Sequence, residues 1–211
     1  MSRRVIGVTL DNLEDLPKHS RKCVFWEVAP HLREQAEEFG TADLEKEAWV
    51  SSVLLEWGSC GRIVYSDKLP VGFVLYAPPT AVPRAAAFPT SPPSPDAVLL
   101  TGFYVLPEFR GGGLARMLVQ AVAKDLTRRG VKAIEAFGDA KPDEEADEAM
   151  CVLPVDFFLS VGFKTVRQHP RWPRVRLELR SAISWKEDVE AALERLLGTV
   201  TVTTASPVLQ R

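Results

Sequence analysis

Apolar and polar residues follow one another along this chain in two rhythms: short runs that suit strands, and longer segments with helical spacing. A strand presents side chains to alternate faces, whereas a helix returns an apolar residue to the same face every three or four positions. We therefore predict strands over residues 5–10, 61–65, 71–77, 98–105, 131–137, 163–168 and 174–179. Helices are predicted over residues 30–39, after Thr41, over 114–129 and over 184–198. Residues 23–27 suit either a strand or a buried loop.

The most informative stretch is the junction at residues 103–116, where an apolar strand runs through a proline into a basic turn with three glycines. An amphipathic helix begins directly after the turn, with Leu114, Leu118, Val122 and Leu126 on one stripe. Glycines let backbone N–H groups crowd an anion, and a helix N-terminus adds roughly half a positive charge. The turn is therefore predicted to hold phosphate. It has neither the Gly-Lys-Ser/Thr ending of a Walker motif nor a GxGxxG dinucleotide fingerprint.

Arg110-x-x-Gly113-x-Ala115 resembles the R/Q-x-x-G-x-G/A signature of the GNAT acetyltransferase superfamily. Residues 156–163 resemble that family's later helix, which ends in Gly-Phe before a strand. The resemblance is good over about residues 60–180 and loose before them. It implies an α/β (α+β) fold in one domain: a mixed, centrally splayed sheet of about six to seven strands flanked by helices.

The resemblance also implies acetyl-CoA as co-substrate, with its pyrophosphate on the turn and its pantetheine along the preceding strand. The implied cofactor-binding residues are Phe103, Tyr104, Val105, Arg110, Gly111, Gly112, Gly113, Leu114, Ala115, Arg116 and Cys151. Family analogy assigns the oxyanion contact to backbone N–H groups near Tyr104 and Val105. We expect no metal, because the three cysteines fit no zinc pattern.

In this family an amine attacks the thioester directly, so a base is needed. An amine with a pKa near 10 costs about 4 kcal/mol to deprotonate at neutral pH. The candidate is Glu135, an isolated acid in residues 133–137, although the alternation of that strand also suits a surface residue. Glu56 and Asp139 are further options, and Glu108 is expected to face solvent.

The sequence departs from the family where many members carry a tyrosine that protonates the leaving thiolate, since that position is Phe158. Tyr104, Ser160 or Cys151 could take the role of that tyrosine, and we predict Tyr104 and Glu135 as the catalytic residues. At a further position, where the family often has an asparagine that contacts the cofactor, this chain has Cys151. As a nucleophile Cys151 would imply ping-pong kinetics, but a buried thiol is the reading we favour. No activating group lies near it in sequence, and we expect direct transfer through a ternary complex.

Composition limits the other possibilities. The 211 residues are 46% hydrophobic, enough for one core, and the net charge of −2 does not suit a nucleic-acid binder. Three unpaired cysteines, and the lack of a signal peptide or membrane span, predict a cytoplasmic protein that works away from membranes. We expect a monomer or homodimer. The domain is predicted over residues 1–181, followed by a helix at 184–198 and a tail at 199–211.

Two segments bear on the acceptor. Residues 78–95 hold seven prolines and are expected to form an ordered loop, a lid or an arm onto a second subunit. Residues 143–148 hold five acids, which form either a solvated face or a surface that attracts a cationic amine. The predicted function is acetyl transfer from acetyl-CoA to a primary amine, with a protein lysine preferred. The alternatives are a small-molecule amine acceptor or a catalytically weak acyl-CoA-binding regulatory module.

Overall fold

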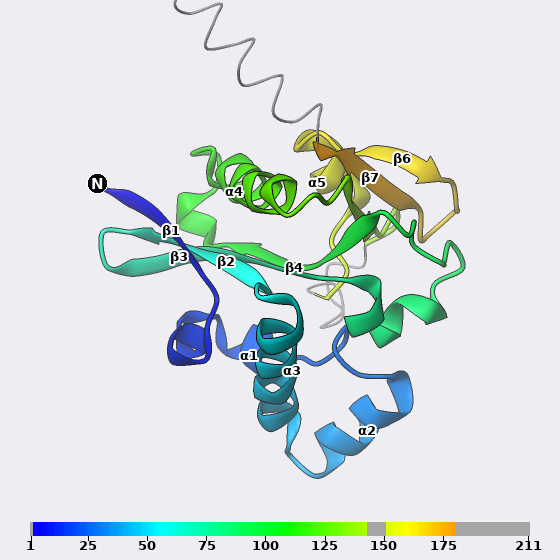
Figure 1. Cartoon of the computed structure of the whole chain (residues 1–211), viewed down its shortest axis with the longest axis horizontal. Coiled ribbons are helices and arrows are strands. Elements are labelled where there is room, and N and C mark those ends of the chain that lie inside the picture. The colour runs from blue at the N-terminus through cyan, green and yellow to red at the C-terminus, as the bar shows by residue number, and fades with distance from the viewer. Residues whose placement is uncertain (1, 143–150, 180–211) are drawn as a thin grey trace, which may run out of the picture.

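The computed structural model describes residues 2–142 and 151–179, which build one seven-stranded sheet between two layers of helices (Figure 1). The strand order across the sheet is β1-β2-β3-β4-β5-β7-β6. The strands are β1 (Arg3–Gly7), β2 (Gly61–Ser66), β3 (Leu69–Ala77), β4 (Ala97–Val105), β5 (Ala133–Phe137), β6 (Lys164–Arg167) and β7 (Arg174–Glu178). The mixed α/β fold and the number of strands confirm the prediction.

Strands β4 and β5 are the only parallel neighbours in the sheet of the described residues, and their pairing is short. β4 pairs with β5 from Ala97 to Leu99, where Leu99 lies opposite Glu135. β4 continues to Val105 with β3 beside it, so its other edge lacks a strand partner there among the described residues. A register shift in the β3–β4 pair, between Leu75 and Tyr76, falls at the same level. The sheet therefore opens at its centre.

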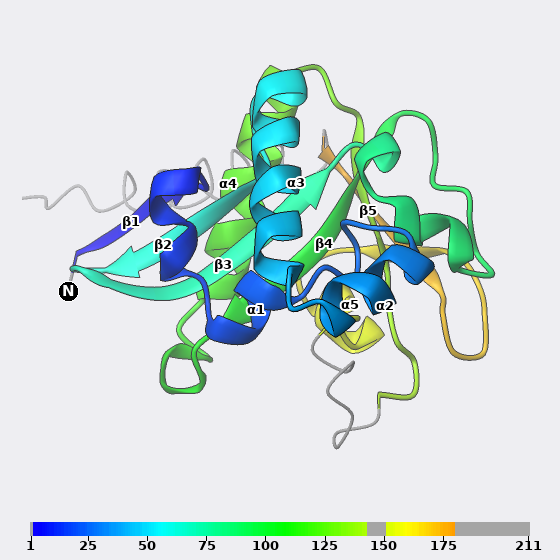
Figure 2. The same ribbon diagram turned by 90° about the horizontal axis from the view of Figure 1, so that it is seen from below.

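Helices cover both faces because each sheet face is apolar. On one face lie α1 (Lys18–Lys22), α2 (Pro30–Glu38) and α3 (Ala42–Trp57), shown from their own side in Figure 2. On the other lie α4 (Leu114–Arg128) and α5 (Val155–Ser160). The stripe predicted for α4 is buried, with Leu118, Val122 and Leu126 each fully enclosed. None of the described helices is long and apolar enough to cross a membrane.

The proline-rich segment is an ordered part of the core. It forms two short 3-10 helices, η2 (Pro79–Ala81) and η3 (Pro83–Ala87), and buries Val82, Ala85 and Phe88. The Phe88 ring stacks on Trp26 and Phe137, with ring centroids 5.1 Å and 4.5 Å apart. This packing matches the ordered loop among the three interpretations of residues 78–95, which also included a lid and an arm onto a second subunit.

Other expectations differ in detail or fall outside the described part. The ambiguous residues 23–27 form a buried loop rather than a strand, with Val24, Phe25 and Trp26 enclosed. The first strand starts two residues earlier than predicted, at Arg3. The acidic run at 143–148, the helix at 184–198 and the tail at 199–211 lie outside the described residues.

Candidate active site

A cavity of about 400 Å³ lies where the sheet opens, between β4 and the loop that follows α1. Its walls come from five parts of the chain: α1 with the loop after it, α3, strands β3 and β4, the start of the glycine-rich turn, and the start of the segment after residue 150. The lining residues are His19, Ser20, Cys23, Trp26, Glu27, Lys46, Phe73, Leu75, Thr101, Gly102, Phe103, Tyr104, Arg110, Cys151 and Leu153. The predicted residues Phe103, Tyr104, Arg110 and Cys151 thus come together here.

The glycine-rich turn lies at the end of β4, beside this cavity. A 3-10 turn, η4 (Pro107–Phe109), leads to Gly111 and Gly113, which adopt positive φ values of 76° and 78°. A non-glycine residue would be strained at both positions. All three glycines are exposed, and a Cβ at Gly111 or Gly113 would meet no atom within 4 Å. The turn therefore offers open backbone to a ligand at the N-terminus of the fifteen-residue helix α4.

Two arginines hold this turn in place. Arg110 donates from Nε to the Val105 carbonyl at 3.0 Å, which folds its side chain back along β4. Arg3, on the edge strand β1, donates from Nη1 to the Gly112 carbonyl at 3.0 Å. Leu114 is buried in the core, so only its backbone can face a ligand. The arginines and the helix terminus together make the turn electropositive.

A buried ion pair lies in the cavity wall. Glu27 and Lys46 contact each other through Oε1 and Nζ, with side-chain exposures of 2% and 3%. The second carboxylate oxygen of Glu27 accepts a hydrogen bond from the Trp26 backbone N–H at 3.1 Å. A buried charge is costly unless it is paired, and each of these two side chains is the other's ionic partner. The cavity also contains the buried Thr101 hydroxyl, which has no hydrogen-bond partner in the described structure.

Glu135 occupies a different place from the one expected of a base. Its side chain is fully buried on β5 and lies outside the cavity lining. Its Oε2 lies 3.5 Å from Nη1 of Arg174, and its Oε1 lies 3.2 Å from Nη1 of Arg176. It also accepts a hydrogen bond from the Ser94 backbone N–H. The surface position that strand alternation suggested is thus excluded, and the contacts describe an internal brace between β5, β7 and the proline-rich loop.

The remaining candidates also lie away from the cavity. Glu56 is exposed on α3, and Glu108 is exposed as expected. Asp139 is buried, but its carboxylate accepts from the Lys141 backbone N–H at 2.8 Å. Ser160 is exposed and donates to the Phe157 carbonyl. Phe158, at the position of the family tyrosine, is buried in the core.

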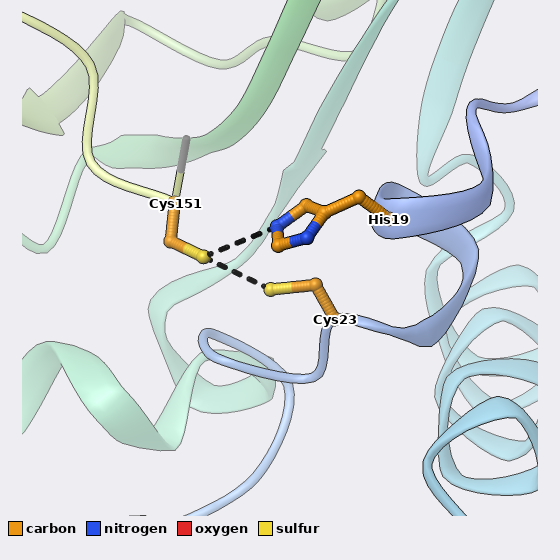
Figure 3. A group of neighbouring side chains, drawn as sticks. All are labelled: His19, Cys23 and Cys151. Atoms are coloured by element: carbon orange, nitrogen blue, oxygen red, sulfur yellow. Dashed lines mark hydrogen bonds between the residues drawn. The ribbon is translucent and has the colours of Figure 1, made fainter. Parts of the chain in front are cut away.

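Three further side chains gather at one end of the cavity (Figure 3). The Sγ atoms of Cys23 and Cys151 lie 3.1 Å apart, and Nε2 of His19 lies 3.7 Å from Sγ of Cys151. The hydrogen bond from the Cys151 thiol lowers the pKa of Cys23 to about 6, while the same contact raises the pKa of Cys151. Cys151 is buried, and the contact with Cys23 raises its pKa, so this contact does not activate Cys151 as a nucleophile and is consistent with the buried thiol that the sequence favours.

Sequence reasoning missed Glu27, Lys46, Thr101, His19, Cys23 and Arg3 as site residues. Most of them belong to residues 11–60, where the family resemblance is loose, and no spacing links them to the glycine turn. The sequence does contain one sign of the buried ion pair. Glu27 is an acid in the otherwise apolar run of residues 23–28, and a charge there needs a buried partner.

Known proteins resemble this chain both in sequence and in fold. The family model described as acetyltransferase (GNAT) family matches residues 14–150. The PaiA N-acetyltransferase from Thermoplasma acidophilum, solved with coenzyme A, aligns with a TM-score of 0.54 at 12% identity, covering 84% of this chain and 99% of that one. YncA from Salmonella typhimurium, solved with acetyl-CoA, aligns with a TM-score of 0.53 at 14% sequence identity, and the alignment covers 85% of this chain and 95% of that one.

The aminoglycoside acetyltransferase AAC(6')-Ib, solved with coenzyme A, aligns with a TM-score of 0.52 at 16% identity, covering 88% of this chain and 99% of that one. At such identities these likenesses bear on the fold alone. No significant match to a curated protein sequence was found.

Proposed function

The chain belongs to the acetyltransferase (GNAT) family, and from this premise we propose that it moves the acetyl group of acetyl-CoA to a primary amine. The observation that carries the proposal is the edge of β4 from Leu100 to Val105, which has no strand partner among residues 2–142 and 151–179 and leads into an open glycine turn at the N-terminus of α4. An extended chain that ends in a pyrophosphate fits such an edge and such a turn. Similar folds have been solved with coenzyme A or acetyl-CoA bound.

The cofactor's pyrophosphate would lie on residues 110–116, where backbone N–H groups and the helix terminus favour negative charge. Its pantetheine would run along the unpaired edge of β4, past Phe103, Tyr104 and Val105. The thioester would then reach the cavity, and its carbonyl oxygen would accept a backbone N–H near Tyr104 and Val105. This contact would stabilise the oxyanion as it forms.

We assign the general base to Glu27 in place of Glu135. Glu27 lines the cavity and is the carboxylate among the residues that line it. The amine nitrogen attacks the thioester carbon, the C–N bond forms, the C–S bond breaks, and the amine proton passes to Glu27 directly or through a water. The transfer is direct, within a ternary complex.

The leaving thiolate needs little help, because a thiol has a pKa of about 8.5. Tyr104 lines the cavity and is our proposed proton donor to it. For the acceptor we retain a protein lysine as first choice. The support for a cationic acceptor is the acidic run at residues 143–148 of the sequence.

The test is acetyl-CoA thioester loss measured over a panel of lysine peptides and small amines, with Glu27→Gln as the variant. We expect turnover by the wild type, a fall in kcat of roughly 100-fold or more in Glu27→Gln, and recovery as the pH approaches the amine pKa. Glu56→Gln, an exposed acid of the same type, is the control and should behave like the wild type.

Two results would contradict parts of the proposal. An unchanged kcat in Glu27→Gln would remove this residue as the base. Acetyl-CoA binding without turnover on any amine would favour a regulatory acyl-CoA-binding module, in line with the buried Phe158 where many relatives carry a tyrosine.

A further inference from the structure

His19, Cys23 and Cys151 form a group that the proposed transfer does not use. Their ligand atoms all lie within 4.8 Å of one another, and they come from two segments more than 120 residues apart in the sequence. Figure 3 shows the imidazole and both sulfur atoms directed toward one point. A nitrogen and two sulfurs are the donors that zinc prefers.

We propose that these three residues bind one Zn²⁺ ion. Tetrahedral coordination at about 2.0–2.3 Å places neighbouring ligand atoms roughly 3.3–3.8 Å apart. The observed separations of 3.1 Å and 3.7 Å lie close to this range, and the third is within 4.8 Å. Movements of less than about 1 Å would complete the geometry, which side-chain rotations can supply.

The backbone around the group is suited to fixed ligands. His19 and Cys23 are four residues apart at α1, and the Cys23 N–H donates to the His19 carbonyl at 2.8 Å, so both side chains leave the same face of one helical turn. On the opposite side, the Trp26 indole donates to the Cys151 carbonyl at 2.7 Å. Trp26 itself is buried. The ligands are therefore held in place by contacts that do not involve the metal.

The charges of the three ligands match a divalent ion. Two thiolates and a neutral imidazole carry a charge of −2, which Zn²⁺ cancels, and a partly buried site favours such neutrality. The three residues line both the main cavity and a second cavity on the side of Lys18, Lys22 and Arg33. The ion could thus be reached from either side.

The proposed zinc has three protein ligands and one position left for a water or an acceptor group, the arrangement of zinc sites that keep an exchangeable ligand. It would join α1 to the segment after residue 150 across one end of the cavity. This inference does not depend on the proposed transfer, because metal content is measured without turnover.

The test uses the reduced full chain without a polyhistidine tag. After incubation with Zn²⁺ and gel filtration, zinc should be present at about one ion per chain in the wild type. Cys60→Ala removes a buried thiol outside the group and is the matched control, which should hold the same zinc. Cys23→Ser and Cys151→Ser should lose it. His19→Ala should weaken binding by at least the roughly 10- to 100-fold that loss of an outer-shell partner costs.

Cobalt(II) substitution provides a second measurement that needs no variant. The wild type should show the visible bands of tetrahedral Co²⁺ together with thiolate-to-metal charge transfer, even if a serine variant fails to fold. The proposal is overturned if the reduced wild type retains no zinc and shows no such bands, or if both serine variants retain zinc equally well. It is also overturned if the reduced chain binds no zinc and instead forms an intramolecular Cys23–Cys151 disulfide when oxidised glutathione is added.

Discussion

At the scale of single residues, the contacts of the buried Glu135 carboxylate favour a structural role over the role of catalytic base. Its two arginine partners lie on β7, and Arg176 also contacts the exposed Asp96. Removing one partner of a buried ion pair leaves the other charge uncompensated. Glu135→Gln should therefore lower the free energy of unfolding by about 3 kcal/mol while leaving kcat unchanged.

Denaturant unfolding and steady-state rates on the same samples check this prediction. Asp96→Asn is the control and should cost less than about 1 kcal/mol, because its ion pair is exposed to solvent. A large loss of kcat in a Glu135→Gln variant that still folds would instead support Glu135 as the general base.

Cys60 provides a pH test. The side chain is fully buried, and burial raises the pKa of its thiol to about 12. In the unfolded chain the thiol ionises near pH 9, so the stability it contributes is present below that pH and is lost as the pH rises toward 12. At pH 10 the wild type should therefore have lost about 1.4 kcal/mol more than Cys60→Ala, relative to pH 7.

Urea unfolding of both proteins at pH 7 and 10 measures this difference. Parallel losses in the two proteins would show that the buried thiol does not contribute to the pH dependence.

At the scale of elements, the proline-rich segment behaves as part of the core. Phe88 stacks on two other aromatic rings, and the Trp49 indole donates to the Ala81 carbonyl at 2.7 Å. Phe88→Ala should lower the free energy of unfolding by about 3 kcal/mol or more, whereas the exposed Phe39→Ala should cost little. If Phe88→Ala changes only the acceptor KM and leaves stability intact, the segment acts as a lid.

Element types could be read from the sequence where one local rule decides them. The short apolar runs of the strands, the stripe at Leu118, Val122 and Leu126, and the glycine after residue 129 each follow from short-range chemistry, and the structure agrees. Alternation within a strand was a poorer guide, because β5 is buried on both faces. The short helix α1 was missed because Lys18–Lys22 has no buried residue and hence no apolar stripe. Its formation depends on what packs around it rather than on its own pattern.

At the scale of the whole molecule, the candidate site is only partly local. The turn at residues 110–115 is contiguous, and its motif could be recognised in the sequence. The cavity wall joins Glu27 to Lys46 and Cys23 to Cys151 through tertiary contacts. Such pairs depend on how layers pack, which one sequence does not reveal. The sequence predicts Glu135 as the base from its charge alone, because a sequence shows an isolated acid on a strand but does not show its ionic partners.

The measurement that most directly tests the account is calorimetric titration of acetyl-CoA into the wild type, Gly113→Glu and Gly130→Glu. Gly113 and Gly130 lie at opposite ends of α4, share a φ of 78°, and have no atom within 4 Å of an added Cβ. Both variants therefore carry the same backbone strain, but only Gly113→Glu places a carboxylate where the pyrophosphate would lie. We predict that the wild type and Gly130→Glu bind acetyl-CoA with the same affinity and that Gly113→Glu does not bind it. Equal binding by all three proteins would contradict the account.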